Sequence, residues 1–199
     1  NAESWAKAIM EGNRLALVKS ITLMESFRPE DRILARQILN CIKPPTEKSL
    51  RIGVTGAPGV GKSSLIEAIG LLEIESGNRP AVLSIDPSSM LTKGSILGDK
   101  SRMVALSTHQ KAYVRPSSAG VFLGGLSGHT YESILLCEAA GFNRIFIETV
   151  GTGQSDISVF SLCDITMSLI QPGSGDDLQA IKKRILERAA LFIVTQDDG

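Results

Sequence analysis

The chain has 199 residues, 43% of them hydrophobic, and its 21 basic and 21 acidic side chains leave no net charge. Without a charge excess it is not expected to bind nucleic acid or a membrane, and its length suits one α/β domain with a small helical extension. No apolar run approaches the roughly 20 residues that span a bilayer, and the N-terminus lacks a signal-peptide pattern. We expect a soluble, intracellular protein, and a segment of a longer one because the first residue is not Met.

The N-terminal segment, residues 1–44, is predicted to be helical. Its apolar side chains recur at helical spacing, which fits two or three helices. A break is expected at residues 27–31, where Pro29 suits the first turn of the next helix. Pro44 lies in a linker, and the main domain is expected to cover residues 45–199.

Beyond residue 45, apolar strands alternate with helices, which is typical of a parallel sheet with crossover helices. The predicted strands are residues 51–55, 81–85, 112–115, 144–148, 164–170 and 190–195. The predicted helices are residues 62–76, 130–140, 154–162 and 176–188. In such sheets ligands bind beyond the carboxyl ends of the strands, so residues that directly follow a strand are favoured for function.

Residues 56–63 match the phosphate-binding P-loop, G-x-x-x-x-G-K-[ST], between a predicted strand and a predicted helix. The fold class that we expect is therefore an α/β P-loop NTPase. Glycines let backbone N–H groups wrap a phosphate, Lys62 is expected to reach the β- and γ-phosphates, and Ser63 to ligate Mg²⁺. The residues of this stretch that we expect to bind the nucleotide are Gly56, Ala57, Pro58, Gly59, Val60, Gly61, Lys62, Ser63 and Ser64.

Three acidic residues are further candidates for Mg²⁺ binding: Asp86, Asp99 and Glu148. Asp86 follows a predicted strand, Glu148 ends another, and Asp99 lies in a polar, glycine-rich stretch typical of a loop that orders around a triphosphate. Residues 148–151 resemble the D-x-x-G element of GTPases, in which the glycine N–H, here that of Gly151, meets the γ-phosphate. Structural alternatives stay open: an Asx turn or helix cap for Asp86, a turn cap for Glu148 and a solvated charge for Asp99.

The cysteines and histidines predict no metal site. Cys41, Cys137 and Cys163 lie far apart in the sequence, and we interpret them as buried or incidental thiols. His109 and His129 have no cysteine or carboxylate at a spacing typical of metal ligands. A structural zinc or a nickel-carrier site is therefore not expected.

A series of motifs, in order and at matching spacing, resembles the MeaB/ArgK/MMAA family of G-proteins. The stretches that carry the resemblance are residues 20–26, 56–63, 86–89, 94–103, 136–142, 148–155 and 172–183. The resemblance implies a GTPase that acts as a chaperone of an adenosylcobalamin-dependent mutase such as methylmalonyl-CoA mutase. It would gate the loading or protection of the cobalamin and hydrolyse GTP faster with the mutase than alone.

The same resemblance implies GTP and Mg²⁺ as cofactors and a cytoplasmic location, or the mitochondrial matrix in a eukaryote. It implies a homodimer in the full-length protein, formed through a C-terminal arm that lies beyond this chain. Lys62 and Glu148 are the implied catalytic residues. Gln154 is a candidate for orienting water, although it lies two places beyond the position directly after the D-x-x-G glycine, and its alternative role is to start a helix.

The guanine-reading motif of the family, N-K-x-D, is altered here to Thr195-Gln196-Asp197-Asp198. Asp198 matches the carboxylate that binds guanine, whereas Thr195 and Gln196 replace the asparagine that ties the loop to the P-loop and the lysine that covers the base. We therefore expect a weakened preference for guanine. Two rival functions stay open: an ATP-dependent kinase or transport-linked ATPase, and a degenerate nucleotide-binding scaffold.

Overall fold

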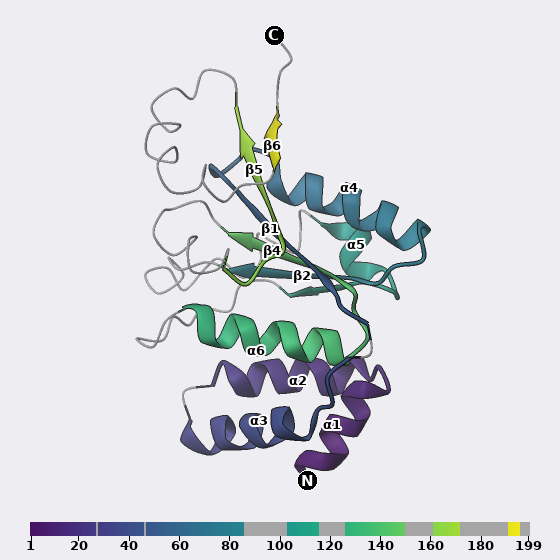
Figure 1. Ribbon diagram of the computed structural model, residues 1–199, viewed down its shortest axis with the longest axis vertical. Helices are drawn as coiled ribbons and strands as arrows, with labels where there is room; N and C mark the ends of the chain where they lie inside the picture. The colour runs from purple at the N-terminus through teal and green to yellow at the C-terminus, as the bar shows by residue number, and fades with distance from the viewer. Residues whose placement is uncertain are drawn as a thin grey trace.

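The computed structural model describes residues 1–26, 28–45, 47–85, 103–115, 126–149, 161–171 and 191–195. These residues form a parallel sheet with helices on both faces, and further helices lie beneath one of these faces (Figure 1). The α/β fold expected from the sequence is confirmed.

The described sheet has the strand order β3-β2-β4-β1-β5-β6, and each neighbouring pair is parallel. The strands are β1 (Leu50–Gly56), β2 (Pro80–Ile85), β3 (Tyr113–Arg115), β4 (Arg144–Thr149), β5 (Ile165–Ile170) and β6 (Leu191–Val194). Each predicted strand is present, and its ends lie within one residue of the predicted ones. Because β1 lies between β4 and β5, the loop that follows β1 leaves the middle of the sheet at its carboxyl edge.

Helices α4 (Lys62–Glu75) and α5 (Val104–Thr108) cover one face of the sheet, and α6 (Leu126–Ala139) covers the other (Figure 1). The prediction for α4 is confirmed. The sequence does not predict α5, and α6 begins at residue 126 rather than at 130.

Two of the predicted helices fall largely outside the described residues. Residues 161 and 162, at the end of the predicted helix 154–162, form a turn, so the helical prediction is wrong for these two positions. The other residues of that range, and the whole of 176–188, are not among the described ones.

Separate apolar clusters fill the two faces of the sheet. On one face, Phe146 of β4 belongs to the same fully buried cluster as Ile66 of α4 and Leu106 of α5. On the other face, Ile145 of β4 shares a cluster with Ile134 of α6. Successive side chains of β4 thus point to opposite faces, as the pleat of a strand requires.

Helices α1 (Ala2–Met10), α2 (Arg14–Met24) and α3 (Pro29–Cys41) precede the sheet. Asn1 and Asn13 cap α1 and α2, because their side-chain oxygens accept hydrogen bonds from N–H groups in the first turn. Pro29 occupies the first turn of α3, where its missing N–H costs nothing.

The three N-terminal helices pack against α6 and share its core (Figure 1). Ile21 of α2 and Ile38 of α3 are fully buried in the cluster that also contains Ile134 and Leu136 of α6. Helix α6 is therefore enclosed between the sheet and the N-terminal helices.

An ion pair joins α2 to the end of β3. Arg115 Nε donates to Glu25 Oε1 at 3.1 Å, and the Arg115 Nη2 donates to the other carboxylate oxygen. Burial alone would lower the pKa of Arg115, but the hydrogen bond to Glu25 and the charge of its carboxylate outweigh it, and the pKa is raised. Arg14, at the start of α2, lies over the Tyr113 ring with 5.8 Å between its Cζ and the ring centroid. These contacts tie the N-terminal helices to an edge strand.

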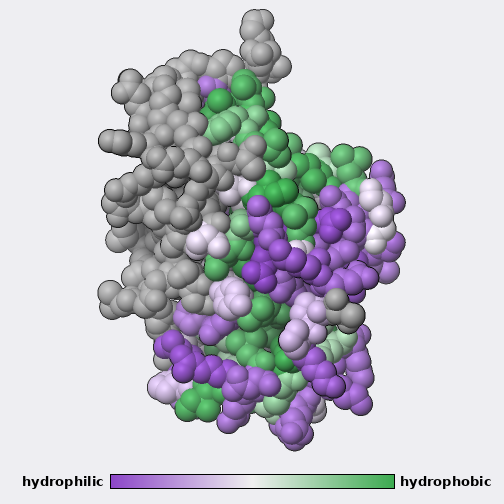
Figure 2. Space-filling model, viewed as in Figure 1, coloured by the Kyte–Doolittle hydropathy of each residue, from purple (hydrophilic) through white to green (hydrophobic). Residues whose placement is uncertain are grey.

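The surface in Figure 2 is hydrophilic over the outer part of α4 and hydrophobic over β5 and β6. On β6 the side chains of Leu191, Phe192 and Val194 are all exposed. Among the described residues no helix is long and apolar enough to cross a membrane.

Replacing Glu25 with Ala is expected to lower the free energy of unfolding by about 2 kcal/mol, because the largely buried Arg115 loses its carboxylate partner. Chemical denaturation followed by circular dichroism measures this loss. The control is Glu11→Ala, which removes an exposed pair with Lys7 at 3.9 Å and is expected to cost less than about 0.5 kcal/mol. Equal losses in the two variants would contradict a structural role for the Glu25–Arg115 pair.

Candidate functional site

The loop between β1 and α4 has a backbone that only glycine adopts readily. Gly56, Gly59 and Gly61 have φ angles of 147°, 84° and 97°, in the region that L side chains rarely enter. A Cβ on Gly56 would also lie 2.6 Å from the backbone oxygen of Leu169 in β5. Val60 is buried, whereas the loop tip at Gly59 is exposed. The loop is thus anchored on the sheet and open at its tip.

Lys62, the first residue of α4, is buried inside this loop. Its Nζ donates to the backbone oxygen of Gly56 at 2.7 Å and to that of Ala57 at 2.9 Å. The ammonium group is therefore held at the start of a helix, where the helix dipole also favours an anion. This arrangement places a fixed positive charge where the motif requires one.

Ser63 and Glu148, predicted as partners in Mg²⁺ binding, lie side by side. Ser63 Oγ donates to Glu148 Oε1 at 2.8 Å, and both residues are buried. Glu148 reaches this position because its strand β4 is the neighbour of β1, with Val54 and Glu148 in register. The Ser63 hydroxyl from α4 and the Glu148 carboxylate from β4 thus meet next to Lys62, which directly precedes Ser63 in the chain.

Ser84 is a site residue that the sequence reasoning missed. It lies near the end of β2, and its Oγ donates to Glu148 Oε2 at 3.1 Å. The available signal was its place in a strand that ends just before the predicted metal ligand Asp86. The register that sets Ser84 beside Glu148 comes from the pairing of β2 with β4.

Thr195 directly follows β6 and contacts the P-loop. Its Oγ1 donates to the backbone oxygen of Val60 at 2.8 Å and lies 3.5 Å from that of Ile170. In the family motif an asparagine ties this loop to the P-loop, and Thr195 and Gln196 stand in place of that asparagine and the following lysine. In the structure the threonine hydroxyl makes a tie of this kind.

Several predicted site residues cannot be compared with the structure, because they lie outside the described residues. They are Asp86, Asp99, Gly151, Gln154, Gln196 and Asp198. Ser64 lies in the first turn of α4, and it is exposed.

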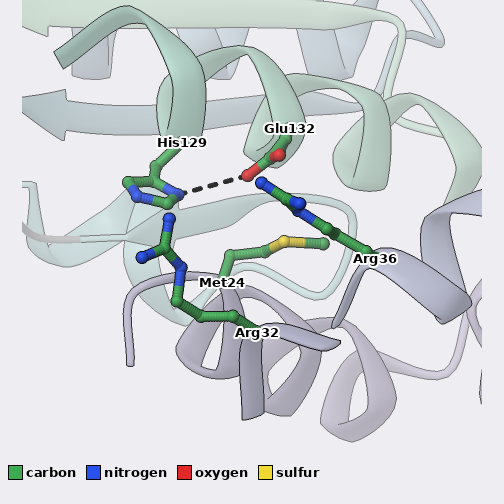
Figure 3. Close-up of a pocket in the computed structure, with 5 residues that line it drawn as sticks. All are labelled: Met24, Arg32, Arg36, His129 and Glu132. Carbon is green, nitrogen blue, oxygen red and sulfur yellow. Dashed lines mark hydrogen bonds and ion pairs between the residues drawn. The ribbon is translucent and has the colours of Figure 1, made fainter. Parts of the chain in front are cut away.

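A hollow lies between α2, α3 and α6, on the opposite side of the sheet from α4 (Figure 3). The hollow is small and partly open to solvent, and it is lined by Met24, Arg32, Arg36, His129 and Glu132. His129 Nδ1 lies 3.2 Å from Glu132 Oε2. Because α6 and the sheet separate this hollow from α4, it is not part of the P-loop site.

Burial raises the pKa of the Cys137 and Cys163 thiols, which makes them poor nucleophiles and poor metal ligands. Cys137 is buried, Cys41 and Cys163 are half-buried, and none of the three forms a disulfide. Burial raises the pKa of Cys163 to about 12, so its thiol stays protonated at neutral pH. Within the described residues no group of three or more His, Cys, Asp or Glu side chains is arranged to hold a metal ion.

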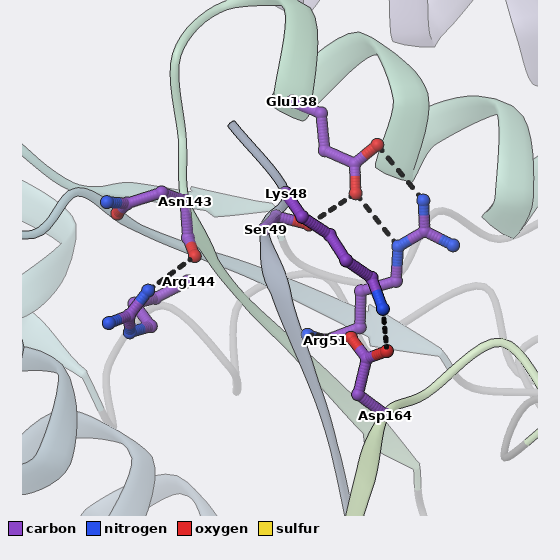
Figure 4. Close-up of polar contacts among 7 residues, drawn as sticks. All are labelled: Lys48, Ser49, Arg51, Glu138, Asn143, Arg144 and Asp164. Carbon is purple, nitrogen blue, oxygen red and sulfur yellow. Dashed lines mark hydrogen bonds and ion pairs between the residues drawn. The ribbon is translucent and has the colours of Figure 1, made fainter. Parts of the chain in front are cut away.

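A polar network lies at the amino ends of the central strands, away from the P-loop (Figure 4). Arg51 Nε and Nη2 donate to the Glu138 carboxylate at 2.8 and 3.0 Å, and Ser49 Oγ donates to the same group. Asp164 accepts from the Arg51 N–H at 3.0 Å and from Lys48 Nζ at 3.1 Å. These bonds join β1 to α6 and to the start of β5, so the network supports the sheet rather than a ligand.

A comparison with family models identifies the family. Residues 17–199 match the model of the methylmalonyl Co-A mutase-associated GTPase MeaB. The chain belongs to this family. The resemblance inferred from the motifs is confirmed.

Curated relatives agree with this assignment. A probable GTPase of Mycobacterium tuberculosis is 50% identical over 194 residues, which are 98% of this chain and 58% of the relative. GTPase ArgK of Escherichia coli is 46% identical over 97% of this chain and 58% of its own length. The mitochondrial methylmalonic aciduria type A homolog of Mus musculus is 42% identical over 96% of this chain and 48% of its own length. The chain thus spans about half of these relatives.

Solved structures support the fold. The crystal structure of a LAO/AO transport system kinase matches with a TM-score of 0.75 and 36% identity, over all of this chain and 57% of that one. The signal recognition particle 54 kDa protein of Aeropyrum pernix, in complex with GDP, has a TM-score of 0.56 at 13% identity, over all of this chain and 52% of that one. The second likeness shows the fold alone.

Gly56→Ala is expected to lower the free energy of unfolding by about 3 kcal/mol, because strain at a positive φ adds to the contact between the new Cβ and Leu169. Gly12→Ala is the matched control, since Gly12 also has a positive φ of 81° but open space around its Cα, and its expected cost is about 1 kcal/mol. Thermal and chemical denaturation measure both. Equal losses of unfolding free energy in the two variants would show that the P-loop can shift to accommodate a side chain at position 56.

Proposed function

We propose that this chain is the nucleotide-binding part of a GTPase that binds GTP with Mg²⁺ and hydrolyses it. The observation that supports this most is the buried hydrogen bond between Ser63 and Glu148 at 2.8 Å, beside a P-loop that encloses Lys62. The names of the relatives point to the same reaction, since several are called GTPases.

Lys62 is the residue that we assign to the β- and γ-phosphates. Its Nζ donates to two carbonyl oxygens of the loop, and a charged phosphate oxygen is a stronger acceptor for an ammonium group than a carbonyl oxygen is. Backbone N–H groups of the loop and of the first turn of α4 would add further donors. In phosphoryl transfer negative charge spreads over the transferred group, so donors fixed in advance around it lower the barrier.

Ser63 and Glu148 fit Mg²⁺, because this cation prefers oxygen ligands and their oxygens already meet at 2.8 Å. Bound there, Mg²⁺ would neutralise charge on the β- and γ-phosphates. Ser63 and Glu148 would hold the cation, and Glu148 would take part in catalysis through it.

The remaining assignments rest on the motifs. We propose Asp86 and Asp99 as further Mg²⁺ ligands, and the Gly151 N–H as a donor to the γ-phosphate. Gln154 is proposed to orient the attacking water, and Asp198 to accept hydrogen bonds from guanine.

The base preference is expected to be for GTP over ATP. Asp198 is kept from the guanine-binding motif, and the bond from Thr195 to the Val60 carbonyl joins the strand before Asp198 to the P-loop. Titration with fluorescent GTP and ATP analogues is expected to give at least about tenfold tighter binding of GTP, since two hydrogen bonds to the Asp198 carboxylate are lost with adenine. Equal or tighter binding of ATP would contradict the guanine assignment.

The partner that we propose is an adenosylcobalamin-dependent acyl-CoA mutase, whose cobalamin loading or protection the full-length protein would gate. The proposal follows the printed family description and the names of the methylmalonic aciduria type A homologs. We further propose a cytoplasmic location, or the mitochondrial matrix in a eukaryote, and a homodimer of the full-length protein.

Lys62→Ala in the full-length protein is expected to reduce GTP hydrolysis at least about 100-fold, because no other group replaces the ammonium at the phosphates. Phosphate release is measured alone and with methylmalonyl-CoA mutase, which is expected to accelerate the wild type and not the variant. Lys48→Ala is the control, since Lys48 pairs with Asp164 at the other edge of the sheet.

Other outcomes of the same assay separate the rival functions. Unchanged turnover in Lys62→Ala would contradict the assignment of the site. Transfer of the phosphate to a small molecule or a protein would identify a kinase, and no phosphate release with any mutase would favour a nucleotide-binding scaffold.

A further inference from the structure

Both oxygens of the Glu148 carboxylate accept hydrogen bonds from serine hydroxyls of different elements. Ser63, in the first turn of α4, donates to Oε1 at 2.8 Å. Ser84, on β2, donates to Oε2 at 3.1 Å. The carboxylate is buried, and buried anions need such donors because they have lost contact with water.

The sheet itself sets the place of Ser84. In the pairing of β2 with β4, Ser84 lies directly beside Glu148, and Val82 lies beside Phe146. Val82 and Phe146 share the apolar cluster on the α4 side, and side chains two residues apart in a strand point to the same face. The hydroxyl of Ser84 is therefore aimed at Glu148 by a rigid strand and not by a loop.

A carboxylate rotates readily about its last torsion, which has broad minima. A donor on one oxygen leaves that rotation open, whereas donors on both oxygens from two elements restrict it. With Oε2 bound to β2, Oε1 points to the hydroxyl of Ser63. This is the pair of oxygens assigned above to Mg²⁺.

We propose that Ser84 is a positioning residue, which holds the Glu148 carboxylate in the orientation that binds Mg²⁺ together with Ser63. In this role Ser84 acts through Glu148 and not by contact with the nucleotide. This role rests on the proposed nucleotide site. It predicts that Ser84 affects how much Mg²⁺ strengthens nucleotide binding, and not the binding measured without Mg²⁺.

The test measures nucleotide affinity of the full-length protein by titration at several Mg²⁺ concentrations and in excess chelator. Ser84→Ala is expected to weaken the gain in affinity that Mg²⁺ provides by about tenfold, the effect of one hydrogen bond to a charged acceptor. Its affinity in chelator is expected to equal that of the wild type. Ser84→Thr keeps a hydroxyl and is expected to restore the gain.

A second measurement follows the metal directly. Electron paramagnetic resonance of Mn²⁺, used as a probe in place of Mg²⁺, is expected to show weaker metal binding to the nucleotide complex of Ser84→Ala. Ser76→Ala is the matched control, because Ser76 Oγ donates to the backbone oxygen of Leu72 at the exposed end of α4. This control is expected to match the wild type in both measurements.

Two results would overturn the role of Ser84 alone: an unchanged Mg²⁺ dependence in Ser84→Ala, or an equal loss of affinity with and without Mg²⁺. The second result would identify general damage to the fold. A wild-type protein whose nucleotide affinity does not respond to Mg²⁺ would instead overturn the proposed site, and the role of Ser84 with it.

Discussion

The buried carboxylate of Glu148 is the constraint on which the arrangement of the site depends. A charge removed from water at the end of a central strand requires hydrogen-bond donors on its neighbours. Those donors are hydroxyls of Ser63 and Ser84, so α4, β2 and β4 must meet at one point. The P-loop precedes Ser63 directly, and its position is therefore linked to the same point.

The rest of the fold holds these elements in register. The apolar cluster on the α4 side fixes the helix that carries Lys62 and Ser63, and the cluster on the other side encloses α6 between the sheet and the N-terminal helices. The Arg51–Glu138 bonds secure the amino ends of the sheet. The site is thus built on strands and a helix that are braced from both faces, and its carboxyl edge is left for function.

The sequence predicts the strands well, because β1, β2 and β4 are short segments rich in apolar residues between turn residues. The spacing of the P-loop motif identifies Lys62 and Ser63, and the position of Glu148 at a strand end identifies their partner. Helix α5 is too short to show a periodicity, and its position depends on the packing of Leu106 against α4, where a Cβ on Gly70 would lie 2.8 Å from that side chain. The start of α6 contains Gly128, which a sequence reading assigns to a loop.

The contacts of Ser84 and Thr195 with the site could not be predicted from a single sequence, for a different reason. Ser84 contacts Glu148 only because β2 pairs with β4 in one particular register, and a local pattern carries no information about register. Thr195 contacts a backbone oxygen of the P-loop, whose position depends on the glycine conformations of that loop. Contacts of these two kinds can be recognised only once the strand register and the loop conformation are known.

The strand order has a consequence for the synthesis of the protein. Strand β1 is made first, yet its two neighbours, β4 and β5, are made only after α6 and after a further connection. Until they leave the ribosome, the backbone of β1 has no sheet partner, and the pairing of distant segments is slow. The bond from Thr195 to Val60 must form later still. The P-loop sequence is therefore made well before the segments that give the loop its final support.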